Sequence, residues 1–422
     1  MRSVRAGMPF ILITVLLDML GIGVIVPVLP ALVTEMRGGT IAEGSATYGW
    51  FVATYALMQF IFSPMIGNLS DAFGRRPVIL VSLLGAGLDY LLMAFAPTLA
   101  WLFVGRVISG ITGANITAVY AYIADVSPPE SRAKNFGLVG ACFGVGFILG
   151  PAAGGLLAHY GLRMPFIASA CLVLLNWLYG FFVLPESHPR ERRRAFDWRR
   201  TNPFATLSVL GKFPVVLGLT ATLVLASLAH QAFPSTWVLY TEYRFNWTAF
   251  ENGLSLALVG LTAIVVQGGL TGKVISKVGE RRALVFGMAI SCCCYLLYGL
   301  ANQGWMFYCI ILLGSIAGVA MPALQALISH QIPLNEQGSV QGALTSLQSL
   351  TGIIGPIVAT HLFGYFISDA APVHVPGAAF YFGSVLVALS VFVAIRSLRR
   401  PEFSVEARSA ATETIESPPA AH

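Results

Sequence analysis

The segment GNLSDAFGRRP, residues 67–77, lies between two long apolar runs at 47–68 and 77–96. Each run has about 20 residues, which is the length that an α-helix needs to cross a hydrocarbon core of about 30 Å. The segment is short, polar and rich in glycine. We therefore expect the chain to cross a membrane, turn within a few residues and cross back.

The same alternation of apolar runs and polar breaks continues along the chain and predicts twelve transmembrane helices. Backbone polar groups cannot lack hydrogen bonds in lipid, so such runs must be helical. Only 10% of the 422 residues are charged and 56% are hydrophobic, whereas soluble proteins carry about 25% charged residues. The fold class is therefore an all-α membrane protein, with spans expected at 8–33, 47–68, 77–96, 99–124, 136–158, 165–184, 214–240, 250–271, 283–301, 304–329, 340–367 and 377–395.

The distribution of basic residues predicts how the chain is oriented. The net charge of +6 comes largely from arginine and lysine at the chain ends and in alternate connections between the spans. By the positive-inside rule, both termini are expected in the cytoplasm. Charge placed in this way does not indicate a nucleic-acid partner, and the long first apolar run, which contains a charge, is not typical of a cleaved signal.

The chain divides into two similar halves. The basic stretch 185–213 separates residues 1–184 from residues 214–395, and a tail at 396–422 is expected to be disordered. Gly74-Arg75-Arg76 recurs as Gly279-Glu280-Arg281-Arg282, about 205 residues later, as in internal repeats about an axis along the membrane normal. We expect two six-helix bundles with a site between them, joined by a solvated linker whose arginines contact lipid head groups.

Two motifs resemble those of a known transporter family. The segment 67–77 resembles the signature loop of the major facilitator superfamily. The fifth span, GLVGACFGVGFILGPAAGG at 137–155, resembles the motif of the drug:proton antiporters in that superfamily. Glycines at intervals of four also let helices pack closely, so packing alone is an alternative explanation. The antiporter motif comprises Gly146, Gly150, Pro151, Gly154 and Gly155.

Further segments resemble the tetracycline/proton antiporters, a twelve-helix branch. They are LDMLGIG at 17–23, YALMQ at 55–59, LDY at 88–90, LPESH at 184–188 and MPALQ at 321–325. The resemblance implies proton-coupled efflux of amphiphilic drugs by alternating access across the inner membrane of a bacterium. The partners implied are a small-molecule drug or metabolite, protons and membrane lipids. A monomer is expected, with no cofactor besides the coupling protons.

The signature loop is expected to act as a gate. Asp71 can pair with Arg75 or with a helix N-terminus, and Gly67 would permit close approach of helices. We expect these contacts to form only when that end of the transporter is closed, which would favour one conformation. The gating residues predicted are Gly67, Asp71, Gly74, Arg75, Arg76 and Asp125.

Three ionisable residues lie inside the predicted spans. An intramembrane charge is costly and indicates function by default. Asp18 and Asp89 lie about 15 and 18 Å from the cytoplasmic face, and Arg106 reaches a similar level from the other side. Arg106 stays charged and needs an anion or polar groups. Our hypothesis is that Asp18 or Asp89 exchanges the proton and that Arg106 tunes this step; a static ion pair is the alternative.

Neutral polar residues within the spans are candidates for contacts with the substrate. They are Gln59, Asn115, His230, Gln231 and Gln325, although a lone membrane histidine is as often a packing residue. The tetracycline pumps have an acid where this chain has Ser291 and a histidine where it has Ala263. These departures favour a second possibility, a transporter of the same fold for a sugar or lipid-like metabolite with weakened or altered proton coupling.

Other classes of protein have little support in the sequence. No zinc-protease, phosphate-binding-loop or nucleophile-elbow motif is present, so no enzyme is expected. The triplet Cys292–Cys294 lies in an apolar run without a histidine or acid at ligand spacing, so no metal site is expected.

Overall fold

The computed structural model describes residues 2–202, 204, 207–333 and 336–399. Twelve helical segments in this part of the chain are long and apolar enough to cross a membrane, which confirms the predicted number of spans. The predicted disorder of the tail falls mainly on residues 400–422, outside the described residues. The spans are formed by α1 (Arg2–Ile25), α3 (Ile41–Phe73), α4 (Arg75–Ala94), α5 and α6 (Leu99–Gly113, Ile116–Val126), α7 (Pro129–Ala158), α8 (Met164–Val183), α9 (Leu217–Phe245), α10, η5 and α11 (Ala249–Val265, Val266–Leu270, Thr271–Val278), α12 (Glu280–Leu300), α13, η6 and α14 (Gly304–Ile316, Ala317–Val319, Ala320–Ser329), α15 (Gln337–Phe366) and α16 (Ala378–Leu398).

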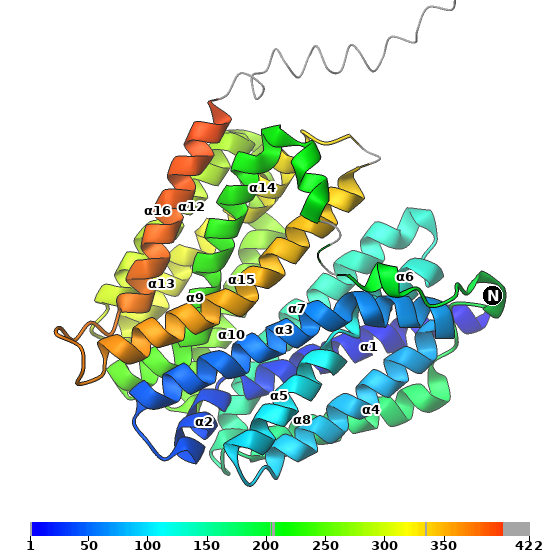
Figure 1. The fold of residues 1–422 in the computed structure, drawn as a ribbon, viewed down its shortest axis with the longest axis horizontal. Helices are drawn as coiled ribbons and strands as arrows, with labels where there is room; N and C mark the ends of the chain where they lie inside the picture. The colour runs from blue at the N-terminus through cyan, green and yellow to red at the C-terminus, as the bar shows by residue number, and fades with distance from the viewer. Residues whose placement is uncertain (1, 203, 205–206, 334–335, 400–422) are drawn as a thin grey trace, which may run out of the picture.

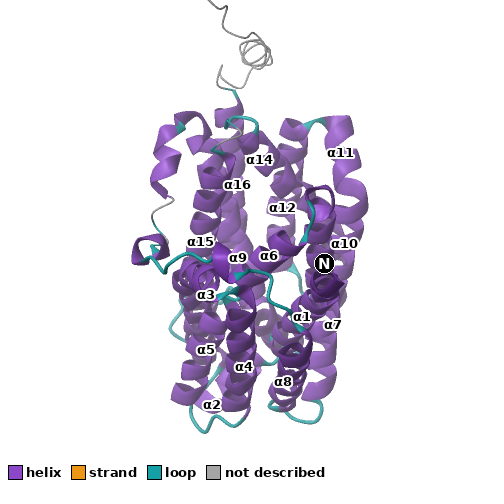
Figure 2. Cartoon of the chain, turned by 90° about the vertical axis from the view of Figure 1, so that its right-hand side faces the viewer, coloured by secondary structure: helices purple, strands orange, loops and turns teal. Residues whose placement is uncertain are grey.

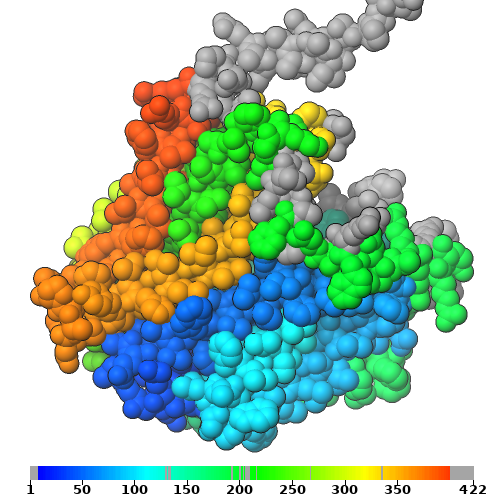
Figure 3. Space-filling model, in the orientation of Figure 1, coloured from blue at the N-terminus to red at the C-terminus, as the bar shows by residue number. Residues whose placement is uncertain are grey.

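The helices form two bundles that meet at one end and diverge at the other (Figures 1 and 2). Between the bundles, α3 packs along α15 and α7 packs along α10. The Ser45 hydroxyl donates to the Thr360 carbonyl over 3.2 Å, so α3 and α15 touch where α3 begins. The space-filling view shows this junction as a continuous surface of blue and orange residues (Figure 3). The opposite end carries the linker, the start of α1 and the end of α16, and there the bundles separate.

The first span is shorter than predicted. We expected it at 8–33, but α1 ends at Ile25 and a separate helix, α2 (Leu29–Arg37), follows. Pro27 lacks a backbone N–H and disfavours the helical conformation of the residue before it, so an apolar run continues while the helix does not. Conversely, α3 extends beyond the predicted span at 47–68, because a capping box of Thr40 and Glu43 starts it in polar sequence.

We had expected a solvated linker, but parts of it pack against the helices. The Asn68 side-chain amide donates to the Asp197 carbonyl over 2.7 Å, and the Phe60 and Phe204 rings lie 5.3 Å apart. Farther along, η3 (Leu207–Lys212) packs against α15. Aromatic residues interrupt the basic run and can cover apolar helix surface, which explains why parts of the linker pack on both bundles.

Candidate transport cavity and gate

Two adjoining hollows lie in the middle of the molecule, one lined mainly by each bundle. The hollow of the N-terminal bundle has a volume of about 460 Å³, and that of the C-terminal bundle about 590 Å³. Gln231 lines both, so together they form one central cavity. The structure brings all eight predicted proton and substrate residues to this cavity: Asp18, Gln59, Asp89, Arg106, Asn115 and Gln231 line the first hollow, and His230, Gln231 and Gln325 line the second.

Asp18 projects from α1 toward the break between α5 and α6. The Asn115 amide donates to Asp18 Oδ2 over 3.3 Å, and the Gln59 amide donates to the nearby Gly113 carbonyl over 3.3 Å. The interrupted helix thus exposes polar backbone in the cavity, where such breaks are tolerated in membrane proteins. Asp18 is partly exposed to the cavity, so a proton or a ligand can reach its carboxylate.

Asp89 is far more deeply buried, with 2% of its surface exposed. The Ser109 hydroxyl donates to its Oδ2 atom, while Oδ1 has no hydrogen-bond partner among the described residues. Gly105 makes this contact possible, because a β-carbon there would lie 3.1 Å from Oδ1 and 2.4 Å from the Met93 side chain. Ser109 is one turn farther along the same face of α5. The Ser109 hydroxyl is thus the described donor that orients this buried carboxyl group.

Arg106 does not form the static ion pair that was one of our two interpretations. Its Nε atom donates to the Phe51 carbonyl over 3.5 Å, and its guanidinium carbon lies 4.6 Å from the centre of the Tyr55 ring. Within the described residues, no carboxylate oxygen lies within 4.0 Å of its guanidinium nitrogens. The two cavity acids instead take their hydrogen bonds from the neutral donors Asn115 and Ser109.

The C-terminal hollow is neutral and aromatic. Its lining includes Ser291 and Ala263, the two departures noted in the sequence, and among the described residues it contains no aspartate, glutamate, lysine or arginine. His230 is exposed to the hollow. One turn beyond it, the Phe233 ring packs 4.9 Å from that of Tyr298, which also lines the hollow. This side of the cavity offers hydrogen bonds and ring faces.

The sequence analysis missed several residues of the cavity. Tyr55 was not proposed, although it stands four residues before Gln59 and so shares its helix face. Ser109 was not proposed, although it follows Arg106 by three residues. Helix periodicity would have found both. Other unpredicted members are Tyr48, Tyr295, Tyr298, Gln348 and Thr351.

The predicted gate forms a network within the N-terminal bundle. Arg75 Nη1 lies 2.5 Å from Asp71 Oδ1, and Arg75 Nε lies 3.2 Å from Asp125 Oδ2. Gly74 has a φ of 105°, which turns the chain sharply from α3 into α4. The Arg75 backbone N–H donates to Glu186 Oε1 over 2.9 Å, so the linker joins the network through a residue that we had not predicted.

One expectation about this gate was wrong. The Asp71–Arg75 pair is present although the bundles diverge at this end, because both partners belong to one bundle. At Gly67 the nearest described atom to a β-carbon would be the Thr117 hydroxyl at 4.0 Å in this open arrangement, so its expected role in the closed conformation stays a prediction. Arg76 reaches the network through its backbone N–H, which donates to Glu186 Oε1 over 3.5 Å, while its Nη2 atom donates to the Phe181 carbonyl over 2.7 Å.

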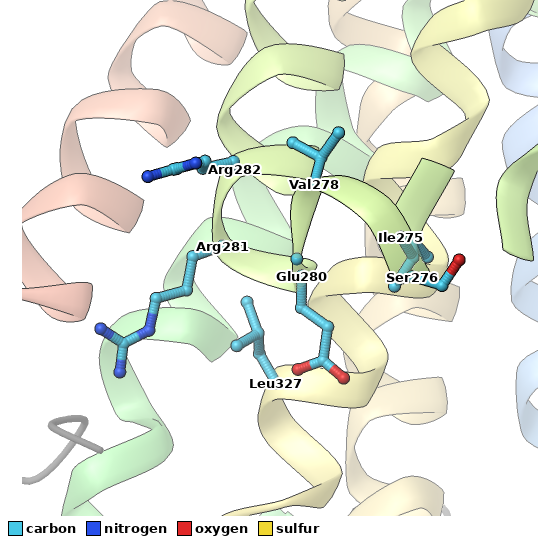
Figure 4. Close-up of a pocket in the computed structure, with 8 residues that line it drawn as sticks. Ile275, Ser276, Val278, Glu280, Arg281, Arg282 and Leu327 are labelled. Atoms are coloured by element: carbon cyan, nitrogen blue, oxygen red, sulfur yellow. The ribbon is translucent and has the colours of Figure 1, made fainter. Parts of the chain in front are cut away.

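The C-terminal bundle repeats the backbone plan of the gate with an acid in place of Arg75 and a histidine in place of Asp125. Gly279 has a φ of 83°, and Glu280 Oε2 lies 3.4 Å from His330 Nδ1, where the first bundle has Arg75 and Asp125. Glu280 and Arg281 lie on either side of Leu327 in a surface pocket, and Arg282 points away from both (Figure 4). The halves therefore share a backbone plan but differ in charge.

The glycines of the fifth-span motif hold α7 against two neighbours. Gly146 and Gly150 face α1, and a β-carbon on Gly150 would lie 2.7 Å from the Cα atom of Gly23. Gly155 faces the other bundle, where a β-carbon would lie 2.6 Å from the Ala249 carbonyl oxygen at the start of α10. The motif thus packs α7 against α1 within the N-terminal bundle and against α10 of the C-terminal bundle.

Two helical bundles around a largely apolar cavity with a few polar and ionisable side chains, closed at one end and open at the other, define a membrane transporter by fold. The chain belongs to the Major Facilitator Superfamily, whose family model matches residues 11–356. It is 44% identical to the class C tetracycline resistance protein of Escherichia coli, over 84% of this chain and 88% of that protein. It is 42% identical to the class G tetracycline resistance protein of Vibrio anguillarum, over 85% of this chain and 91% of that protein.

Solved structures agree with this assignment. The human organic anion transporter MFSD10 (TETRAN) aligns with a TM-score of 0.67 and 25% identity, over 93% of this chain and 99% of that one. The nucleoside transporter NupG aligns with a TM-score of 0.76 and 11% identity, over 93% and 99% of the two chains, which shows the fold alone.

Proposed function

We propose that this protein exports tetracycline-like amphiphilic drugs in exchange for protons by alternating access. The observation that carries the proposal is the central cavity, because every polar residue predicted for coupling or drug contact lines it. The tetracycline resistance proteins, which the chain matches over most of its length, support the same function. These relatives do not favour our alternative, transport of a sugar or lipid-like metabolite.

In this proposal both termini lie in the cytoplasm of a bacterium, and the chain works as a monomer in its inner membrane. The basic residues at the diverging end support that orientation. The structure then has its cavity open toward the cytoplasm, the side from which a drug would be collected. The contacts between α3 and α15 and between α7 and α10 would seal the outer end.

We place proton exchange on the N-terminal bundle. Antiport requires that a drug and a proton do not occupy the site together. A carboxylate meets this need, because protonation removes the charge that attracts a cationic group of the drug. Asp18 is accessible in the cavity and Asp89 lies behind Ser109, so both remain candidates. The C-terminal hollow has Ser291 and Ala263 in its lining, and the lining residues that the structure describes include no acid for the task.

The proposal is tested by resistance of a drug-sensitive bacterium that expresses the protein. Wild-type protein should raise the tetracycline concentration needed to stop growth. Asp18→Asn and Asp89→Asn should lower resistance, because an amide cannot exchange a proton. Asp369→Asn, at an exposed position after α15, is the matched control and should leave resistance unchanged. Full resistance in the double variant Asp18→Asn/Asp89→Asn would remove these acids as proton carriers.

A further inference from the structure

A carboxylate from the linker covers the start of α4 in the N-terminal bundle. Glu186 Oε1 accepts from the backbone N–H groups of Arg75 and Arg76, over 2.9 and 3.5 Å. Glu186 Oε2 lies 3.5 Å from Arg193 Nη2. The first N–H groups of a helix have no partner inside the helix and carry the positive end of its dipole. The start of α4 is therefore an anion site that the chain fills with a carboxylate of its own.

The start of α12 has the same backbone but lacks this cover among the described residues. Gly279 precedes α12 with φ 83° and ψ 152°, and Gly74 precedes α4 with φ 105° and ψ 156°. A β-carbon on Gly74 would collide with the Glu186 carboxylate, whereas no described atom lies within 4 Å of a β-carbon on Gly279. No described side chain accepts from the N–H groups of Glu280 and Arg281. The two halves thus share the anion site but not its occupant.

A surface pocket of about 520 Å³ lies at this helix start and carries unpaired positive charge. Arg281 and Arg282 line the pocket, and neither guanidinium has a hydrogen bond or an ion pair with a described residue (Figure 4). Glu280 also lines it, but its Oε2 atom lies 3.4 Å from His330 Nδ1. Two unpaired cations beside the N-terminus of a helix are a setting that favours an anion.

The sequence places a carboxylate where the second half needs one. In the first half, α8 ends at Val183 and Pro185-Glu186 follows at once. In the second half, α16 ends at Leu398 and Pro401-Glu402 follows in the same way. Moreover, α8 packs along α4 as α16 packs along α12, so each last span brings the chain back to the helix start in question. Glu402 lies outside the described residues, and only its position in the sequence enters here.

We propose that Glu402 binds in the pocket at the start of α12. Its carboxylate accepts from the first N–H groups of that helix and pairs with Arg281 or Arg282. The contact repeats, in the second half, the one that Glu186 makes in the first. It attaches the first residues of the tail to the C-terminal bundle, just as Glu186 attaches the linker to the N-terminal bundle. Each bundle then binds the segment that leaves its own last span.

Distances between spin labels on the tail and on α11 test this contact in the full-length protein in phosphatidylcholine nanodiscs. The labels are carried by cysteines at Ser404 and at Lys277, which is exposed between two pocket residues, in a background without the six native cysteines. The parent protein should give a short, narrow distance distribution. Glu402→Gln should lower the ratio of bound to released tail about fivefold, the scale of a lost helix cap. Glu406→Gln, at the next acid of the tail, is the matched control and should change nothing.

Changes on the pocket side complete the test. Arg281→Gln/Arg282→Gln should release the tail as Glu402→Gln does, and combining all three changes should release it little further, because they remove one contact. Arg190→Gln, at an exposed position of the linker, is the control for lost charge. A broad distribution in the parent protein, or one that Glu402→Gln leaves unchanged, overturns the proposal.

A phospholipid is the competing occupant, and native mass spectrometry with added phosphatidylglycerol detects it. One lipid molecule that stays bound in Glu402→Gln and in the parent protein alike, but is lost in Arg281→Gln/Arg282→Gln, would assign the pocket to a lipid head group and overturn the proposal. Lipid binding that is the same in the parent protein and in Arg281→Gln/Arg282→Gln supports it. All variants are first shown to be folded by their thermal melting.

Discussion

Replacing Gly49 with valine should open the closed end of the transporter. Gly49 lies on α3 against α15, where a β-carbon would stand 2.0 Å from the Thr360 hydroxyl oxygen and 3.2 Å from the Pro356 carbonyl oxygen. Thr360 is completely buried, and its hydroxyl donates to the Pro356 carbonyl over 2.8 Å, so it has little room to move. Overpacking of this kind costs about 1–3 kcal/mol.

Only the conformation that is closed at this end is destabilised by this overpacking. The equilibrium between the two conformations should therefore shift by about 5- to 150-fold toward the state in which this end opens and the terminus-bearing end closes. The size of the change in the average structure depends on the populations of the two conformations in the parent protein, but the direction of the change does not. Export should slow as well, because the cycle must pass through the penalised state.

Distances between spin labels at the terminus-bearing end measure the shift. Labels on cysteines at Phe73 and Gln341, both exposed, report the separation of α3 and α15 in a background without the six native cysteines. Gly49→Val should shorten this distance. Gly140→Val is the matched control, because no atom of a described residue lies within 4 Å of a β-carbon there. A distance distribution for Gly49→Val that matches those of Gly140→Val and the parent protein would refute the reasoning.

Two further changes test the polar contacts of the N-terminal bundle. Ser109→Ala removes the hydrogen bond that the Ser109 hydroxyl donates to Asp89, which is worth about 1.5–3 kcal/mol when the acid is charged; tetracycline export in vesicles should slow, because the carboxyl group loses the donor that orients it, and an unchanged rate would show that this contact does not serve transport. Glu186→Gln weakens the attachment of the linker, because Glu186 accepts from the Arg75 N–H and lies 3.5 Å from Arg193 Nη2. Trypsin should then cut at Arg193 and Arg194 faster than in the control Glu191→Gln, whereas equal rates would show that this contact does not hold the linker.

Much of the fold could be predicted from the sequence because lipid imposes a simple rule. Long apolar runs must be helical, and the repeat of Gly74 and Gly279 about 205 residues apart indicated two similar bundles. Hydropathy could not locate helix ends, since α1 stops before Pro27 inside an apolar run and α3 starts at a cap in polar sequence.

The cavity residues could be predicted for a related reason. A polar residue within a span avoids lipid, so Asp18, Arg106 and Gln231 had to face the protein interior. Their partners could not be predicted, because the rotation of each helix decides which side chains meet. Depth along the membrane placed Asp89 and Arg106 at one level, yet Asp89 faces Ser109. Glu186 was missed because its contact with Arg75 depends on how the linker folds back onto α4.

The central claim is most directly tested by drug-induced proton movement in liposomes that contain the purified protein and a pH-sensitive dye. With a proton gradient imposed, added tetracycline should release protons down the gradient through wild-type protein. The release should be lost in Asp18→Asn/Asp89→Asn and kept in Asp369→Asn. Tetracycline movement without proton movement, or proton release that persists in the double variant, would contradict the account.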